Sequence, residues 1–145
     1  MNMYDLSDLV VERQKLGNVT DIKIFRVLRF MPYSIIGDGA NGILYKNGKD
    51  LGRNLGLNGA SEAVKFMHEN RIGELEILQE DPYHLRVDEC LSCAGLPESG
   101  KPLCHFEGGL LAGIIESVSG RAVDFREVKC WGLGNGTCEF KEFVR

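Results

Sequence analysis

The spacing of apolar residues along the chain changes near Gly73. Before this glycine, apolar positions recur at the three-to-four-residue interval of amphipathic helices, and Ser61 with Glu62 in the first turn is typical of a helix start. After it, two short apolar runs flank the turn dipeptide Asp81-Pro82 and predict strands. The pattern predicts helices over 5–15, 33–45 and from Ser61 to Asn70, a strand over 22–30, and strands over 74–79 and 84–93.

The C-terminal half adds one helix and two strands. The segment Glu107–Val118 predicts a helix ending at Gly120, with small residues that suit close packing on a sheet, and strands over 122–132 and 138–144 flank a GNGT turn. We therefore expect a single α+β domain over 1–145, with an antiparallel sheet of four to five strands packed against helices. The small residues of the helix are Gly108, Gly109, Ala112 and Gly113.

Composition is that of an ordinary globular domain, with 43% hydrophobic and 26% charged residues among 145. The formal charge of -4 and the lack of a basic run argue against nucleic-acid binding. No stretch approaches eighteen apolar residues, so no membrane span is expected. The first fifteen residues resemble neither a signal peptide nor a transit sequence, so we expect a cytoplasmic protein.

Five cysteines are an odd number in a chain expected to stay in the cytoplasm, so a disulfide framework is the poorer interpretation. Buried, metal-bound or redox-active thiols are better candidates. The pair Cys90 and Cys93 has CxxC spacing, which fits two metal ligands, a redox pair, or two small residues at the end of a strand.

The stretch EVKCWGLGNGTCEF carries the most chemistry, because it holds Glu127, Cys130 and Cys138. On a regular strand, residues three apart face opposite sides, so Glu127 and Cys130 can meet only if a bulge lies near Arg126-Glu127. A two-residue turn at 135–136 would separate the two thiols, whereas an odd loop such as 134–136 would place them on one face. Thiolates and a carboxylate suit a structural zinc ion, although iron also occupies thiolate sites.

The stretch from Glu89 to Phe143 resembles the 4-vinyl reductase domain family, whose signature contains a cysteine and aromatic before a glycine-rich helix, then E-x2-C, a glycine turn and C-x-F. It is especially similar to small archaeal hydrocarbon-binding members, and a weaker match extends over about 34–143. In aromatic-sensing domains of this fold, one glutamate and three cysteines hold zinc. The resemblance implies zinc ligands at Cys104, Glu127, Cys130 and Cys138, with Cys90, Cys93 and His105 as less favoured ligands.

The same fold occurs in Golgi tethering subunits and is similar to nitric-oxide sensor domains. The resemblance therefore implies an apolar pocket and pairing into homodimers. We expect the domain to bind a small hydrophobic molecule (a hydrocarbon, an aromatic or a tetrapyrrole-like compound) without catalysis, and to pass any signal to a partner protein. The candidate ligand-binding residues are Phe66, Met67, Tyr83, His84, Phe106, Phe125 and Trp131.

Two other functions remain open at this point. The family name implies reduction of a vinyl-bearing tetrapyrrole, and GDGANG at 37–42 has the letters of a dinucleotide-binding fingerprint, but it falls inside a helical pattern without a preceding strand. Alternatively, the glycine-rich helix faces build a dimeric interaction module without a ligand.

Overall fold

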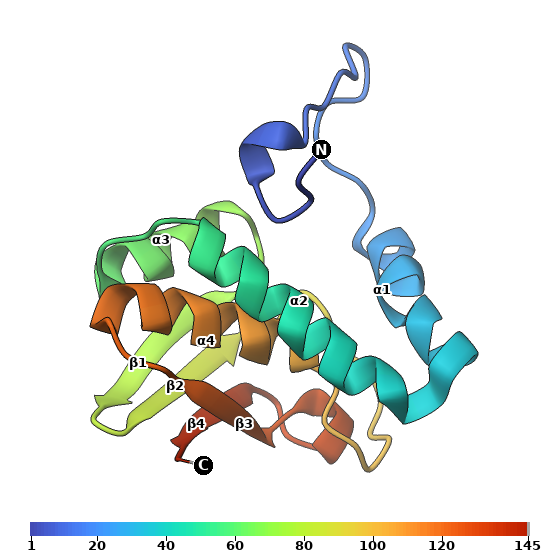
Figure 1. The fold of residues 1–145 in the computed structure, drawn as a ribbon. Helices are drawn as coiled ribbons and strands as arrows, with labels where there is room; N and C mark the ends of the chain where they lie inside the picture. The colour runs from blue at the N-terminus through green and yellow to red at the C-terminus, as the bar shows by residue number, and fades with distance from the viewer. Residues whose placement is uncertain (145) are drawn as a thin grey trace.

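The computed structural model describes residues 1–144 and has the α+β architecture that the sequence predicts (Figure 1). Four strands form one antiparallel sheet in the order β1-β2-β4-β3. Figure 1 shows α4 lying on the sheet, α2 crossing α4 on the side away from the sheet, and α1 standing apart with the N-terminal residues. The elements are α1 Ile22–Ile36, α2 Ala40–Asn54, α3 Ala60–Glu69, β1 Glu74–Glu80, β2 Tyr83–Asp88, α4 His105–Ser119, β3 Asp124–Lys129 and β4 Cys138–Phe143, with 3-10 turns η1 Leu6–Asp8, η2 Gly37–Gly39 and η3 Trp131–Leu133.

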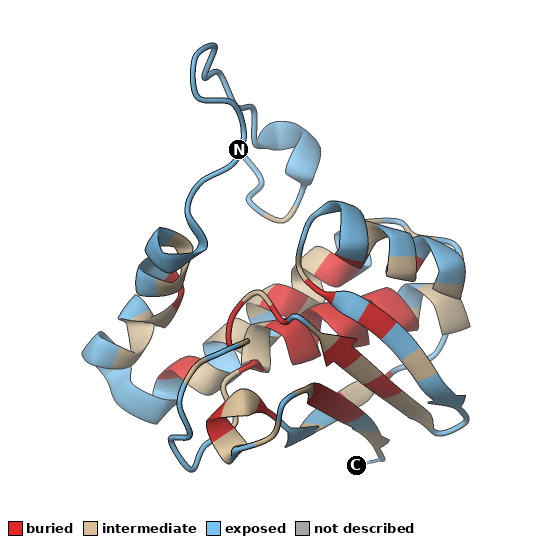
Figure 2. Cartoon of the chain, turned by 180° about the vertical axis from the view of Figure 1, so that it is seen from behind, coloured by how far each residue is buried: buried red, intermediate tan, exposed pale blue. Residues whose placement is uncertain are grey.

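Helix α4 is the centre of the core. Every residue from Glu107 to Ile115 is buried, because the sheet covers one side of the helix and α2 the other (Figure 2). A helix that is apolar around its whole circumference must be covered on all sides. The sequence predicted this helix and its end correctly, since Gly120 adopts the left-handed conformation of a helix C-cap.

Glycines on both helices let the backbones of α2 and α4 touch. A Cβ at Gly48 would collide with the carbonyl oxygen of Phe106, and one at Gly109 would collide with that of Tyr45. Gly52 and Gly113 face each other's helix in the same way one turn further on. The sequence predicted close packing for Gly109 and Gly113, but on the sheet; the structure places them against α2, and only Gly108 meets the sheet, at Phe140.

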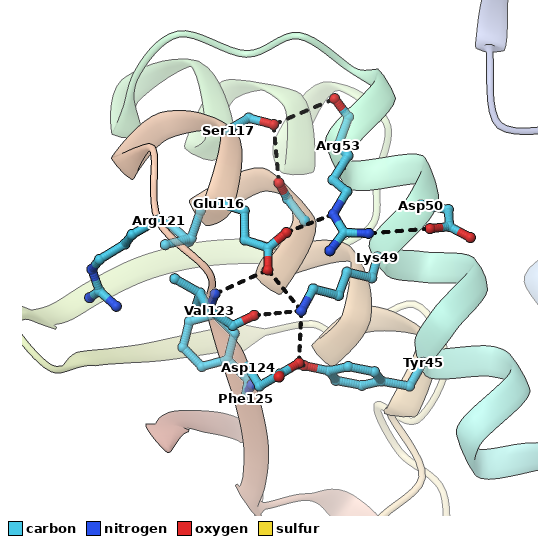
Figure 3. A network of polar contacts seen from close by, with 12 residues as sticks. Tyr45, Lys49, Asp50, Arg53, Glu116, Ser117, Arg121, Val123, Asp124 and Phe125 are labelled. Carbon is cyan, nitrogen blue, oxygen red and sulfur yellow. Dashed lines mark hydrogen bonds and ion pairs between the residues drawn. The ribbon is translucent and has the colours of Figure 1, made fainter. Parts of the chain in front are cut away.

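A polar network closes the other end of this helix pair (Figure 3). Glu116 of α4 pairs with Lys49 at 2.8 Å and Arg53 at 2.6 Å, and Lys49 also pairs with Asp124 at 2.8 Å. Burial alone would raise the pKa of Glu116, but the hydrogen bonds from Arg53 and Lys49 outweigh it and lower that pKa to about 2. The carboxylate therefore stays ionised at neutral pH and ties α2 to the start of β3.

Strand β3 contains the predicted bulge, although one step later than expected. Glu127 pairs with Phe140 and Lys129 with Glu139, so Val128 is the extra residue. Both proposed turn lengths were wrong: residues 130–138 form a longer connection that contains η3. This connection returns the chain so that Cys138 begins β4 opposite Val87 of β2.

The N-terminal predictions need correction. The expected helix over 5–15 is only the turn η1, and Val10 is 86% exposed, because no neighbouring surface covers its apolar residues. The expected strand over 22–30 is the helix α1, whose start is capped by the Asp21 side chain bonded to the amide of Lys23 at 2.7 Å.

The glycine-rich stretch 37–42 joins two helices. Gly37 has a φ of 56° and ends α1, so the helix predicted over 33–45 is broken there. The stretch follows a helix and not a strand, so the dinucleotide fingerprint lacks its required setting. Helix α3 begins after Gly59 and not at Ser61, and the side chain of Glu62 accepts a hydrogen bond from the amide of Asn58 at 2.8 Å.

The glycine contact makes a direct prediction for stability. Gly109→Ala should lower the free energy of unfolding by about 1–3 kcal/mol or more, because its methyl group can be placed only by separating the two helices. Urea unfolding followed by circular dichroism measures this.

Gly42→Ala is the matched control, since a Cβ at Gly42 meets nothing within 4 Å on the same helix α2. It should raise stability by about 0.5–1 kcal/mol through helix propensity. Equal effects of the two substitutions would contradict the packing role of Gly109.

Candidate metal centre and apolar cavity

All five cysteines are free, buried and gathered in one place, which we call the thiol cluster. Cys90 and Cys93 lie in the loop after β2, Cys104 is the N-cap residue of α4, Cys130 follows β3 and Cys138 begins β4. The Sγ atom of Cys104 lies 3.4 Å from that of Cys90, 3.1 Å from that of Cys93 and 3.7 Å from that of Cys138. Segments distant in sequence thus place sulfur atoms together.

Glu127 completes the set that the resemblance implied. Its Oε2 atom accepts the backbone amide of Cys104 at 3.0 Å, while its buried Oε1 atom has no hydrogen-bond partner. Ligand atoms of Cys104, Glu127, Cys130 and Cys138 all lie within 4.8 Å of one another. The bulge at Val128 is what allows Glu127 and Cys130 to face the same side of the strand.

The environment of Glu127 suits a cation. Burial, with the nearby Cys130 as a second cause, raises the pKa of this carboxyl to about 9. A buried carboxylate is costly without a positive partner, and a metal ion supplies one. The unpartnered oxygen and the soft thiolates beside it are the donors that zinc binds in structural sites, so the residues fit this metal.

A second group of donors overlaps the first. Cys90, Cys93, Cys104 and Cys138 also lie within 4.8 Å of one another, and all four are buried. The sequence left Cys90 and Cys93 open, and the structure brings them to the same cluster. His105 belongs to neither group among the described residues; its ring bonds to the carbonyl of Pro102, and burial lowers its pKa.

A buried ion pair lies next to the thiol cluster and was missed by sequence reasoning. Arg29 of α1 approaches Glu107 of α4 at 3.6 Å, with side-chain exposures of 4% and 1%. Ser92, between the two CxxC cysteines, donates its hydroxyl to Glu107. Burial raises the pKa of Glu107 to about 7, with Cys90 as the next cause. The signal in the sequence was a single acidic residue inside an otherwise apolar helix.

An apolar cavity of about 310 Å³ lies between α1, α2 and the N-terminal arm (residues 1–21). Few polar groups reach it: Arg29 lines it, and Tyr4 donates to Asn47 at 2.9 Å on its wall. Larger hollows carry charge instead, such as one of about 530 Å³ bordered by His68, Glu69 and Glu74. The main apolar lining residues are Leu6, Leu9, Phe25, Leu28, Leu44 and Phe106.

Comparison with known proteins places this architecture in a family. The family model of the vinyl-4-reductase domain matches residues 83–141. The chain is 43% identical over 129 residues to the uncharacterized protein MJ1642 of Methanocaldococcus jannaschii, covering 88% of this chain and 80% of that protein. The chain belongs to the vinyl-4-reductase domain family. A second relative, MJ0150 of the same organism, is 34% identical over 147 residues, with 94% and 84% covered.

Two solved structures share the fold of this vinyl-4-reductase domain. A vinyl-4-reductase family protein from Methanocaldococcus jannaschii superposes with a TM-score of 0.69 at 21% identity, covering 89% of this chain and 84% of that one. The phenol-responsive sensory domain of the transcription activator PoxR, solved with phenol, superposes with a TM-score of 0.65 at 15% identity, covering 94% and 85%. In residues 1–144, no helix is long and apolar enough to cross a membrane.

The structure does not gather the seven candidate ligand-binding residues of this vinyl-4-reductase domain around one space. Only Phe106 lines the apolar cavity. Met67 and Phe125 are buried in the core, and Phe66 packs against it. On the sheet, Tyr83 lies under Arg121, and His84 contacts Glu139 at 2.8 Å. Trp131 stands at the turn η3.

Proposed function

We propose that this protein binds a small, mainly apolar molecule in the cavity between α1, α2 and the N-terminal arm. The observation that carries the proposal is the apolar lining of about 310 Å³ with Arg29 as the charged group at its wall. Ligand sites are concave and mostly apolar with a few convergent polar groups, and their volumes begin near this size. The phenol-bound structure of the PoxR sensory domain, which has the same fold, supports this class of ligand.

Binding of phenol and of toluene to the purified protein tests the proposal by isothermal titration calorimetry. Leu44→Trp should weaken binding at least about tenfold, because the larger side chain fills the cavity that Leu44 lines. Ile43→Trp is the matched control: Ile43 is the neighbouring residue of α2, is 52% exposed and should leave the affinity unchanged. Equal affinities of wild type and Leu44→Trp would contradict this location of the site.

We also propose that Cys104, Glu127, Cys130 and Cys138 hold a structural zinc ion. The support is the common location of their ligand atoms within 4.8 Å and the unpartnered, buried Oε1 of Glu127. With four protein ligands, zinc has no open position for a substrate. The ion would bind two ends of the β3–β4 connection to the start of α4 and hold the shape of the domain.

Removal of the metal should therefore lower the melting temperature. A bound ion at about 1,000 times its dissociation constant contributes roughly 4 kcal/mol, which corresponds to about 8–16 °C for a domain of this size. Melting is measured before and after treatment with a chelator and a reductant, and again after zinc is returned. An unchanged melting temperature together with no zinc in elemental analysis would show that the site is wrong.

A homodimer formed through α1 is the second part of the proposal. Large apolar side chains on this helix are exposed, including Val27 at 68%, Leu28 at 61% and Ile35 at 73%. Exposed apolar surface of this kind marks an interaction site in soluble proteins. Leu28 also lines the apolar cavity, so a second copy seated on α1 would cover its open side.

Light scattering after size-exclusion chromatography tests the pairing. Wild type should have the mass of two chains, and Ile35→Glu should have the mass of one, because a charge cannot be buried at the centre of an apolar contact. Lys23→Glu changes charge on the same helix at a polar position and should remain dimeric. A monomeric wild type at micromolar concentration would exclude the dimer.

A further inference from the structure

The two groups of metal donors in the thiol cluster share one edge. Cys104 and Cys138 belong to both, whereas Cys90 and Cys93 complete one group and Glu127 and Cys130 complete the other. A single ion bound in either group would leave two buried donors of the other without a ligand role. Thiolate sulfur can bridge two metal ions, since it carries more than one lone pair. Six donors with two shared are the number that two four-coordinate ions need.

The distances agree with this arrangement. Zinc–sulfur bonds of about 2.3 Å in a tetrahedron place two sulfur ligands about 3.8 Å apart. The shared pair, Cys104 and Cys138, has its Sγ atoms 3.7 Å apart, and Cys130 lies 4.0 Å from Cys104. Cys93 lies closer to both shared residues, at 3.1 and 3.2 Å, so a second ion needs an outward movement of a few tenths of an ångström.

The loop that carries Cys90 and Cys93 is built to present these thiols. The amide of Ser92 donates to the Sγ of Cys90, and the amide of Ala94 donates to the carbonyl of Cys90 at 3.0 Å. Arg26 of α1 fixes the loop from outside through the carbonyls of Leu91 at 3.0 Å and Ala94 at 2.9 Å. CxxC on such a tight turn is the usual ligand pair of structural zinc sites.

Charge also favours a second ion. Five thiolates and one carboxylate carry six negative charges when ionised, and they lie in the interior, where uncompensated charge is costly. One divalent ion offsets two of these charges, and two ions offset four. Each thiol that binds releases its proton to solvent, so no oxidant or reductant is required.

From these observations we propose that the thiol cluster and Glu127 hold two divalent metal ions bridged by the sulfur atoms of Cys104 and Cys138. One ion has Cys90 and Cys93 as its other ligands, and the second has Glu127 and Cys130. The inference extends the single zinc site proposed above, and the number of ions per chain separates the two: one ion leaves that site standing without the bridge, and none removes both.

Cobalt titration of the metal-free full chain, kept reduced and free of oxygen, is the decisive experiment. Tetrahedral Co²⁺ replaces zinc at thiolate sites and is coloured and paramagnetic. Its visible absorption should rise until two ions per chain are bound. The electron paramagnetic resonance signal should rise with the first ion and lose most of its intensity with the second, because bridging sulfur couples the two spins. Saturation at one ion, or a signal that keeps rising to the second, would overturn the proposal.

Variants assign the two positions. The double substitution Cys90→Ser/Cys93→Ser should bind one cobalt ion with an undiminished resonance signal, and Glu127→Gln/Cys130→Ser should do the same through the other group. The wild-type titration remains decisive if either variant does not fold. His68→Ala is the matched control, because exposed His68 and Glu74 lie 2.6 Å apart and could hold a surface ion. Loss of the second ion in this control would place that ion at the surface and contradict the bridge.

Discussion

The close crossing of α2 over α4 determines how the rest of the domain is arranged. At Gly48, Gly52, Gly109 and Gly113, no side chain separates the two backbones. The depth of α4 in the core is therefore fixed by backbone contact and not by side chains that can change rotamer. The N-terminal end of α4 brings Cys104 to the thiol cluster, and its C-terminal end carries the carboxylate that pairs with α2.

The thiol cluster fixes what hydrogen bonds of helices and strands do not. Residues 89–104 contain neither a helix nor a strand, and the β3–β4 connection contains only the turn η3. Both segments converge on Cys104, whose amide bonds to Glu127, while the neighbouring amide of Leu103 bonds to Cys130 at 3.4 Å. Cross-linking such segments through metal stabilises the fold most, because they have few other long-range contacts.

Sequence reasoning succeeded where a residue's role depends on its near neighbours and failed where the deciding contact is distant. The apolar composition of 107–118 requires a buried helix, and the shift of the alternating pattern near Glu127 requires a bulge. Residues 22–30 are apolar enough for a strand or a helix, and the chain forms α1 with Asp21 as its cap. The cavity was unpredictable because its walls come from the N-terminal arm and three helices, none with a ligand motif of its own. Large candidate side chains such as Met67 fill the core instead.

The cavity and the thiol cluster are joined by one short series of charged and polar contacts. Arg29 lines the cavity and faces Glu107, and Glu107 accepts the hydroxyl of Ser92 in the CxxC loop. Two nitrogens of Arg29 and one oxygen of Glu107 have no other hydrogen-bond partner, so a polar group entering the cavity finds unsatisfied donors. A ligand that draws Arg29 away would leave Glu107 without its cation beside the cysteines, and in the interior that change in charge cannot be screened by solvent.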